Sequence, residues 1–393
     1  MKQKELYDFV NEHTARCRIL VAGDVMLDKY YYSEVTRISP EAPVPIAHVR
    51  SEMETLGGAA NVAHNLARLG CQTSIAGFVG DDYHCKSLLE KFHKRGIACE
   101  GLIKTDRPTT TKLRIIGGHQ QMLRLDFEES APITGDDAAR FLDYIQQKLQ
   151  EGLDCLIISD YGKGVCTKEN CQAIIAACKA HHVPVIVDPK GTNWMKYAGA
   201  DYITPNLKEI NAVLTDPIRN EDAPVEQAAR AVMKKFHLGS IIVTRSEAGL
   251  SLVREEEIEH IPTKAQEVFD VSGAGDTVIA VFAMGIAGGL APRDSARRRC
   301  RSRQARHLRR QSGRTHSGAQ EREIGFNRFK RVSPLTANES SARMRNGGAA
   351  PRAEYKAGDA CHSGFSLLPL EGGAPKGRRL ALLAIARGLA PSY

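Results

Sequence analysis

The chain has 393 residues, of which 42% are hydrophobic, and a formal net charge of +8. The charge is not evenly spread, because the residues from Ala291 to Tyr393 carry a net +15 and the preceding ones a net −7. The chain is thus a mildly acidic body followed by a basic tail. The overall charge is therefore no argument that the body binds nucleic acid.

Ten cysteines are scattered along the chain, without a CxxC pair or the Cys/His spacing of a metal site. We interpret them as reduced thiols of a cytoplasmic protein. The first residues lack the apolar stretch of a signal peptide, and no run of about 18 apolar residues predicts a membrane span. We expect a cytoplasmic location and no membrane partner.

Short apolar runs alternate with helical patterns along the body. In chain order they predict a strand at 18–22, a helix at 59–69, a strand at 73–80, helices at 81–95 and 136–151, a strand at 155–159, a helix at 167–181, strands at 183–187 and 202–204, a helix at 225–236 and a strand at 240–244. A further apolar helix follows Thr277. This order predicts an α/β sandwich with a mostly parallel sheet covered by helices on both faces. Ligands of such sheets bind at the carboxyl ends of the strands.

Two segments, 29–49 and 112–128, interrupt this alternation. They are rich in Tyr, Val, Ile, Thr and Arg and alternate polar with apolar residues, which is typical of half-exposed strands. We expect them to form a small sheet that projects from a domain covering residues 1–290. Such a sheet beside the strand ends could act as a lid over a ligand.

From residue 291 the sequence becomes rich in Arg and loses its apolar period, and its composition cannot bury a core. A disordered tail is one interpretation, and an arm that binds nucleic acid is another. A third hypothesis is a change of reading frame near residues 291–299. With permissible codons, Cys300–Ser317 read one nucleotide later can encode AAAGKHVISVGKVGARTV, an apolar helix followed by a glycine turn. Resequencing the gene tests this hypothesis.

The strongest chemical motif is DVSGAGDT at 270–277. The small residues Gly273, Ala274 and Gly275 let backbone N–H groups approach an anion at a helix start. Such a nest can hold the charge on a transferring phosphoryl group. Asp276 beside it can accept a proton from an attacking hydroxyl. A glycine turn capped by an aspartate is the structural alternative.

A second motif, GGAANVA, begins at Gly57 and Gly58 and opens a helix on which Asn61 can hydrogen-bond hydroxyls. Tight packing of strand on helix would also use these glycines. Asp24 and Asp28 follow the first strand, where carboxylates suit sugar hydroxyls, although helix capping is an alternative.

Together these residues resemble the ribokinase-like, or phosphofructokinase-B, family of sugar kinases. The resemblance rests on GGAAN, GFVGDD at 77–82, the Asn206–Glu209 element, Thr244-Arg245 and DVSGAGD, in the right order over about residues 16–290. Further segments resemble the heptose-7-phosphate kinase branch of that family. They are GDVMLD at 23–28, RISPEAPVP at 37–45, TTTKLR at 109–114, QQMLRLDFE at 120–128, SDYGKG at 159–164, DPKG at 188–191 and AQEVF at 265–269.

The resemblance implies transfer of the ATP γ-phosphate to the anomeric hydroxyl of D-glycero-β-D-manno-heptose 7-phosphate, a step towards ADP-heptose for lipopolysaccharide. It implies Asp276 as general base, the adjacent small residues as anion hole, and a sugar site made of Asp24, Asp28, Gly57, Gly58 and Asn61. Asp160 is a further candidate for a sugar hydroxyl, with a structural cap as the alternative. Lys112, Arg114 and Arg124 on the lid are the candidates for binding the substrate phosphate, with ordinary solvated charges of the lid as the alternative. Lys163 is a weaker candidate.

For the nucleotide, the resemblance implies a site lined by Lys190, Asn206, Glu209, Thr244, Ser246 and Gly249. Hydrated Mg²⁺ is expected near Asn206 and Glu209, without direct protein ligands. Lid strands of this family often pair between subunits, so a homodimer is expected. The family completes its adenine pocket after the GAGD helix, where this sequence changes character. The alternatives are therefore another sugar kinase, a catalytically impaired kinase, or a nucleic-acid-binding protein that uses the basic tail.

Overall fold

The computed structural model describes residue 9, residues 12–263 and residues 273–296, and all of them fall within one compact unit. Three expectations lie outside the described residues. These are the segment AQEVF, residues 270–272 of the DVSGAGDT motif, and the character of the tail from residue 297 onward. The boundary at residue 290 stays a prediction, although Ser295 and Ala296 are still buried.

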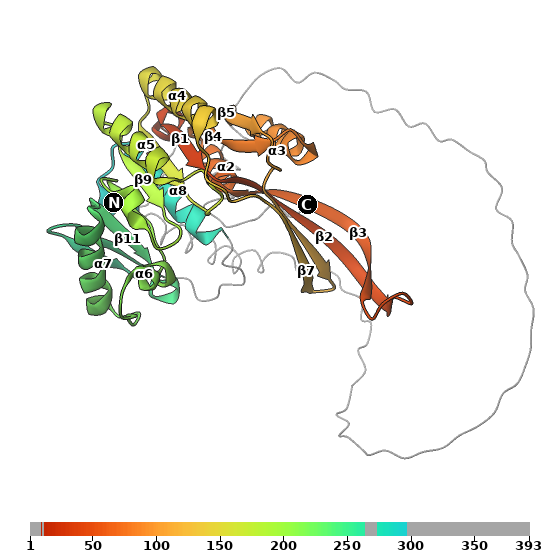
Figure 1. Cartoon of the computed structure of the whole chain (residues 1–393). Coiled ribbons are helices and arrows are strands. Elements are labelled where there is room, and N and C mark those ends of the chain that lie inside the picture. Colours follow the sequence, from red (N-terminus) through yellow and green to blue (C-terminus); the bar gives the residue numbers. More distant parts are fainter. Residues whose placement is uncertain (1–8, 10–11, 264–272, 297–393) are drawn as a thin grey trace, which may run out of the picture. The chain divides into compact units, whose positions relative to one another are not determined.

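A nine-stranded sheet forms the centre of the described chain (Figure 1). Its strands, in spatial order, are β13 (Ile258–Ile261), β12 (Leu250–Val253), β11 (Ser240–Thr244), β10 (Tyr202–Ile203), β9 (Val185–Asp188), β8 (Cys155–Ser159), β1 (Arg18–Gly23), β4 (Gln72–Gly80) and β5 (Ala98–Thr105). All neighbours from β11 to β5 run parallel, and β12 and β13 are antiparallel additions at one edge. The mostly parallel sheet is therefore confirmed.

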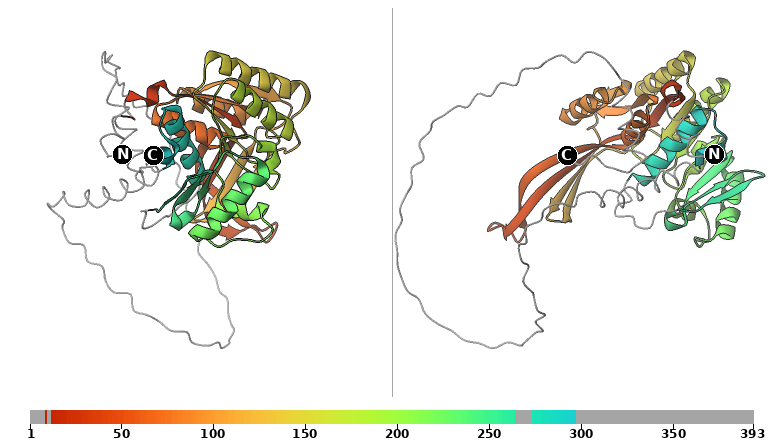
Figure 2. Two further views of the ribbon diagram at one scale, coloured as in Figure 1. Left: turned by 90° about the vertical axis from the view of Figure 1, so that its left-hand side faces the viewer. Right: turned by 180° about the vertical axis from the view of Figure 1, so that it is seen from behind.

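Helices cover both faces of this sheet, as the views in Figure 2 show. One face packs against α2 (Ala59–Leu69), α3 (Tyr83–His93) and α8 (Ala274–Ala287), and the other against α4 (Gly135–Glu151), α5 (Lys168–Ala180), α6 (Leu207–Val213) and α7 (Asp222–Phe236). Strand β1 alternates between them: Leu20 and Ala22 enter one core, and Ile19 and Val21 the other. Burial on both faces explains why the strands read as continuous apolar runs.

The predicted helices and strands agree with the structure to within a few residues. Helices α3 and α6 differ from the prediction. Helix α3 begins at Tyr83 rather than at Asp81, because Asp82 is its N-cap and accepts a hydrogen bond from the Cys85 N–H at 2.8 Å. Asp82 therefore caps the helix instead of lying in its first turn, and Asp81 pairs with Lys104. Helix α6 was not predicted separately; it begins at a capping box between Asn206 and Glu209.

The expected small sheet, here called the lid, has four strands in the order β3-β2-β6-β7. They are β3 (Pro45–Gly58), β2 (Val25–Ile38), β6 (Thr111–Gly117) and β7 (Gln120–Phe127). The long hairpin of β2 and β3 extends away from the central sheet in Figure 1. Both predicted segments are in it, but β2 and β3 are longer than expected because their inner halves continue into the core at Val25 and Gly58.

The base of the lid is tied to helix α3 by charges. The Lys29 ammonium lies 3.1 Å from the Glu54 carboxylate, which also lies 3.2 Å from Lys91 and accepts a hydrogen bond from the Ser87 hydroxyl. Lys29 is almost fully buried, and Glu54 is its partner across β2 and β3. The Lys29–Glu54 pair joins the two lid strands, and Glu54 connects them to α3 through Lys91 and Ser87.

Candidate active site

The carboxylate of Asp276 lies at the centre of the site, at the start of α8. Its Oδ2 accepts a hydrogen bond from the Asn61 amide at 2.5 Å, and its Oδ1 accepts one from the Tyr161 hydroxyl at 2.6 Å. Burial raises the pKa of the Asp276 carboxyl, the two hydrogen bonds lower it, and the negative charge of Asp28 raises it, with a net upward shift. A carboxylate with a raised pKa is suited to accept a proton near neutral pH.

The GGAAN motif lies against the residues predicted to bind the sugar. A side chain on Gly57 would meet the Asp28 carboxylate at 2.3 Å, and one on Gly58, which has φ +54°, would meet the Asp24 carbonyl oxygen at 2.6 Å. Glycine is thus required at position 58 by its backbone contact and positive φ, whereas a side chain at position 57 would displace the Asp28 carboxylate. The turn brings Asp28 and Asn61 to the same region as Asp276.

Asp24 binds the protein's own backbone. Its carboxylate accepts hydrogen bonds from the N–H groups of Tyr161 at 2.7 Å, Lys163 at 3.0 Å and Val165 at 3.3 Å. Burial, together with the negative charge of Asp160, raises its pKa to about 6, and the three backbone hydrogen bonds oppose that shift. The described contacts of Asp24 therefore hold the 161–165 loop in place.

Asp160 is likewise engaged within the chain. It pairs with the Lys196 ammonium, accepts the Tyr197 hydroxyl at 2.5 Å and accepts the Gly162 N–H at 2.7 Å. Its side chain is 1% exposed. These contacts match the structural alternative better than a hydroxyl ligand.

Four of the six residues expected to bind the nucleotide line an open pocket of about 150 Å³ together with the turn at Gly273–Asp276. Its wall includes Lys190, Asn206, Glu209 and Thr244 opposite Gly273–Asp276. Beside Gly275, no described atom lies within 4 Å of where a side chain would begin, so the backbone is open to the pocket. The first N–H groups of α8 are orphaned by helix geometry and can bind an anion there.

Acidic groups also line this pocket. Burial, followed by the charges of Asp276 and Glu209, raises the pKa of Asp188 well above its ordinary value. Burial likewise raises the pKa of Glu209, although the N–H of Asn206 and the charge of Lys190 lower it. Lys190 lies 3.8 Å from Glu209. The surplus of negative charge fits a site that receives a cation together with phosphates.

Ser246 and Gly249 lie just beyond the pocket, in a tight turn after β11. Ser246 has φ +48°, and the Gly249 carbonyl oxygen accepts the Arg245 N–H at 2.9 Å. The buried Arg245 guanidinium anchors the turn, because it donates to Asp222 at 2.5 Å and to Ser251 at 3.0 Å. The turn directly follows Thr244, which lines the pocket.

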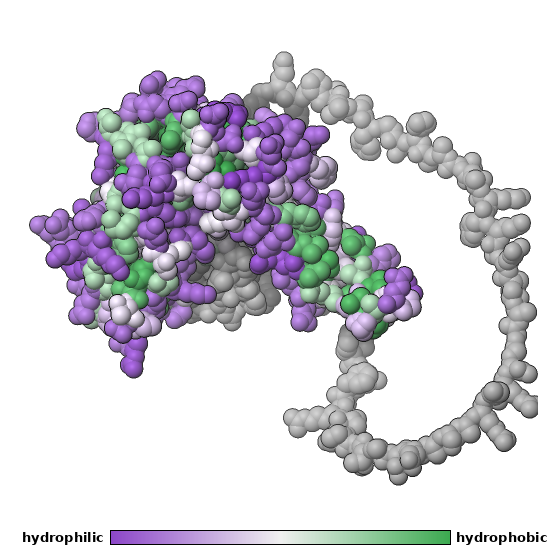
Figure 3. Space-filling view, in the orientation of Figure 1, coloured by the Kyte–Doolittle hydropathy of each residue, from purple (hydrophilic) through white to green (hydrophobic). Residues whose placement is uncertain are grey.

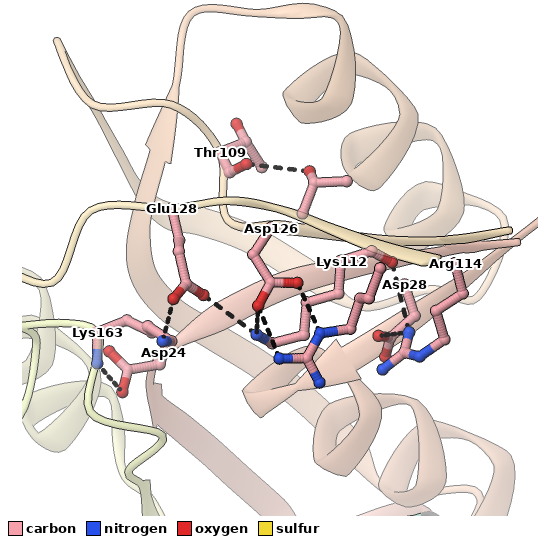
Figure 4. Close-up of polar contacts among 10 residues, drawn as sticks. Asp24, Asp28, Thr109, Lys112, Arg114, Asp126, Glu128 and Lys163 are labelled. Carbon is pink, nitrogen blue, oxygen red and sulfur yellow. Dashed lines mark hydrogen bonds and ion pairs between the residues drawn. The ribbon is translucent and has the colours of Figure 1, made fainter. Parts of the chain in front are cut away.

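The predicted phosphate cations Lys112, Arg114 and Arg124 form a row on one face of the lid. Figure 4 shows Lys112 and Arg114 with their acidic partners. Lys112 lies 3.4 Å from Asp126 and 3.1 Å from Glu128, and Arg124 donates two 2.9 Å hydrogen bonds to Asp126. Arg114 is directly opposite Arg124 across β6 and β7, and it donates to Asp28 at 2.6 Å. Two arginines placed opposite each other repel unless anions lie between them.

Sequence reasoning missed several residues of this arrangement. Tyr161 and Asp188 stood in motifs that had been noted, but no role had been given to them. Asp126 and Glu128 face the lid cations, and Glu128 also accepts the Lys163 ammonium at 2.7 Å. The period-two pattern of β7 could have placed Arg124 and Asp126 on one face, since residues two apart share a face.

The model of the pfkB family of carbohydrate kinases matches residues 17–302. The chain belongs to that family. Its match ends within the Arg-rich sequence.

Among the relatives of this pfkB-family chain is the bifunctional protein HldE of Trichlorobacter lovleyi, 42% identical over 291 residues, or 74% of this chain and 58% of the relative. HldE of Vibrio vulnificus strain CMCP6 is 44% identical over 279 residues, or 71% of this chain and 57% of the relative. The chain therefore spans less than two thirds of these curated relatives.

Solved structures show the same ribokinase-like fold. Arabidopsis thaliana ribokinase with ribose and ATP matches with a TM-score of 0.58 at 20% identity, covering 74% of this chain and 91% of that one. The tetrameric inhibited form of Escherichia coli phosphofructokinase-2 matches with a TM-score of 0.61 at 16% identity, covering 74% and 94%. These likenesses support the fold alone. Within the described part of this pfkB-family chain, we find no helix with the length and apolar character needed to cross a bilayer.

Proposed function

We propose that this chain phosphorylates the anomeric hydroxyl of D-glycero-β-D-manno-heptose 7-phosphate with ATP, giving the 1,7-bisphosphate for ADP-heptose and lipopolysaccharide synthesis. The observation that carries the proposal is the position of Asp276. Its carboxylate accepts a hydrogen bond from Asn61, which belongs to the proposed sugar site. Asp276 also lines the same pocket as the nucleotide-site residues Lys190, Asn206, Glu209 and Thr244. The relatives named HldE support this branch of the family.

In the proposed reaction, the sugar oxygen attacks the γ-phosphorus while the proton of that hydroxyl passes to the Asp276 carboxylate. The bond from the γ-phosphorus to the β,γ-bridging oxygen breaks, and ADP leaves. The backbone of Gly273–Gly275, which lines the pocket, would supply N–H groups for the charge on the moving phosphoryl group. Asp28 and Asn61 would orient the acceptor sugar.

The residues present also fit a nucleotide with Mg²⁺. Asp188 and Glu209 are carboxylates with raised pKa values, and a cation nearby would relieve their mutual repulsion. When bound, Mg²⁺ supplies charge neutralisation for the triphosphate. Lys190 and Thr244 would bind phosphate oxygens, and the turn with Ser246 and Gly249 would support the nucleotide.

A phosphorylated acceptor is proposed because of the lid row. Lys112, Arg114 and Arg124 come from paired strands and lie on one face. Arginine binds phosphate through a two-pronged contact, and lysine as a point charge. An unphosphorylated sugar would leave this row with no role in substrate binding.

We further propose a homodimer through the lid. Its side opposite the cation row is apolar and exposed along β7, where Leu123, Leu125 and Phe127 are 50%, 41% and 44% exposed. Apolar patches on the lid are visible in Figure 3. A second copy of the chain would cover such a face. The described cysteines are free thiols, which is consistent with the proposed cytoplasmic location.

The test is ATP consumption by the full purified chain with a panel of sugars: the heptose 7-phosphate, ribose and fructose 6-phosphate. We expect turnover with the heptose 7-phosphate, and ³¹P NMR should show a new anomeric phosphate. Asp276→Asn should lose about 10²–10⁴-fold in kcat while still binding ATP. Turnover restricted to another sugar would contradict the heptose proposal.

A second candidate is a kinase whose activity is impaired by its C-terminal sequence. The Arg-rich sequence from residue 297 favours this candidate. The two are distinguished by restoring the shifted reading frame in the gene. Turnover that appears only in the restored protein would support the frameshift hypothesis. An intact reading frame on resequencing, with equal turnover in both proteins, would reject it.

A further inference from the structure

Both oxygens of the Asp276 carboxylate receive a hydrogen bond from another part of the chain. Asn61 on α2 donates to Oδ2, and this residue belongs to a motif expected to bind sugar. Tyr161 donates to Oδ1 at 2.6 Å from the loop after β8. The second donor comes from outside both glycine motifs, and the proposed function has not given it a role.

Tyr161 is held in place independently of Asp276. Its backbone N–H donates to the buried Asp24 carboxylate at 2.7 Å, and the N–H groups of Lys163 and Val165 bind the same carboxylate. Three N–H groups on one carboxylate fix the path of the loop. The hydroxyl of Tyr161 is therefore held against Asp276 by contacts within the chain.

The hydrogen bond has a chemical consequence. A hydroxyl that donates to a carboxylate stabilises the ionised form, which is the form that can accept a proton. Burial and the charge of Asp28 on β2 act in the opposite direction on Asp276, and the charge of Asp188 at the end of β9 also faces this group. Burial and the charge of Asp276 raise the pKa of Tyr161, so the phenol keeps its proton and remains a donor.

We propose that Tyr161 is a positioning residue that keeps the Asp276 carboxylate ionised and aimed at the acceptor hydroxyl. The proposal rests on the proposed function, in which Asp276 removes the proton of that hydroxyl. The proton passes from the sugar to Asp276, and Tyr161 exchanges none. Asn61 holds the second carboxylate oxygen of Asp276, and it belongs to the proposed sugar site.

The first test is the pH dependence of kcat/KM for the full chain and for Tyr161→Phe. Loss of a hydrogen bond to a charged acceptor should move the acid limb upward by about one pH unit. Below that limb the variant should be about tenfold slower than the wild type. The matched control is Tyr144→Phe, a half-buried tyrosine on α4 remote from the pocket, which should leave the acid limb unchanged. A uniform loss at every pH, with an unmoved limb, would overturn the proposal.

Should Tyr161→Phe not fold, 3,5-difluorotyrosine at position 161 keeps the shape and is a stronger donor. It should move the acid limb to lower pH, and an unchanged limb would count against the proposal. A second readout needs no turnover: the ¹³C carboxyl signal of Asp276 in unliganded protein, assigned with Asp276→Asn. Its titration should move upward in Tyr161→Phe. If the titration of Asp276 shifts in Tyr161→Phe but no sugar is turned over, the proposed substrate is rejected. The role of Tyr161 in keeping Asp276 ionised would then still hold.

Discussion

The amide of Asn61 donates to the carboxylate of Asp276 at 2.5 Å, although 215 residues separate the two. This contact joins the helix start of α2 to that of α8, two helices that pack side by side on one face of the sheet. It brings a group expected to bind sugar to the proposed base. A sugar held by Asn61 would therefore have a hydroxyl near the group that removes its proton.

Asn61→Asp tests this relationship. The substitution places a second carboxyl against Asp276, and two carboxylates in contact cannot both be ionised without a large cost. We expect the acid limb of kcat/KM to move upward and kcat near neutral pH to fall by about tenfold or more. ATP affinity should stay close to that of the wild type, because Asn61 does not line the nucleotide pocket. A normal pH profile would contradict the contact.

The pKa of Asp24 makes a prediction about stability. The fold raises this pKa from an ordinary 3.8 to about 6, so the folded state holds the proton more tightly than the unfolded state. The resulting stabilisation is present below about pH 4 and is lost as the pH rises through 6. Asp24→Asn cannot titrate. Its free energy of unfolding relative to wild type should therefore rise by about 2 kcal/mol between about pH 4.5 and 7.5.

Urea unfolding at the two pH values measures this difference, because the other ionisable groups are common to both proteins. A difference that is constant with pH would show that Asp24 titrates normally.

The lid row predicts opposite effects for neighbouring substitutions. Arg124→Gln removes a cation and should raise the KM for the phosphorylated sugar about tenfold. Asp126→Asn removes the carboxylate that occupies Arg124 and Lys112, so it should lower that KM or leave it unchanged. Arg140→Gln is the control, since Arg140 forms an exposed pair on α4. Equal KM changes in all three variants would exclude the lid row as the phosphate site.

Arg245 predicts a separation between the two substrates. Its guanidinium is 3% exposed and donates to Asn220, Asp222 and Ser251, and of these three partners Ser251 is the buried one that Arg245→Met leaves without its donor, since Asp222 is 64% exposed. We expect a loss of about 1–3 kcal/mol in stability and a KM for ATP at least about fivefold higher. The KM for the sugar should change little, because the turn borders the nucleotide pocket.

Arg254→Met is the matched control for this experiment, since Arg254 forms an exposed pair with Glu257 between β12 and β13. That variant should stay within about 0.5 kcal/mol of wild type. A KM for ATP that is equally raised in both variants would contradict a role of the turn after β11 in nucleotide binding.

The sequence was sufficient where structure depends on local pattern. The bounds of α2, β8 and β11 agree with the predicted ranges. The reason is that the apolar pattern of a buried strand or an amphipathic helix lies within one continuous stretch of sequence. The short strands β12 and β13 and the edge strand β5 were missed. Their pairing depends on neighbours that are distant in the sequence or on charged turns that interrupt the apolar pattern.

By itself, the sequence determined the α/β class, the lid segments and the candidate residues of the site, because spacing and residue type carry those signals. Only the tertiary structure decided what each side chain faces. It turned Asp24 towards the backbone of the 161–165 loop, placed Tyr161 on Asp276, and set Asp126 between Lys112 and Arg124. The direction of a side chain depends on which distant elements pack beside it, and no local pattern contains that information.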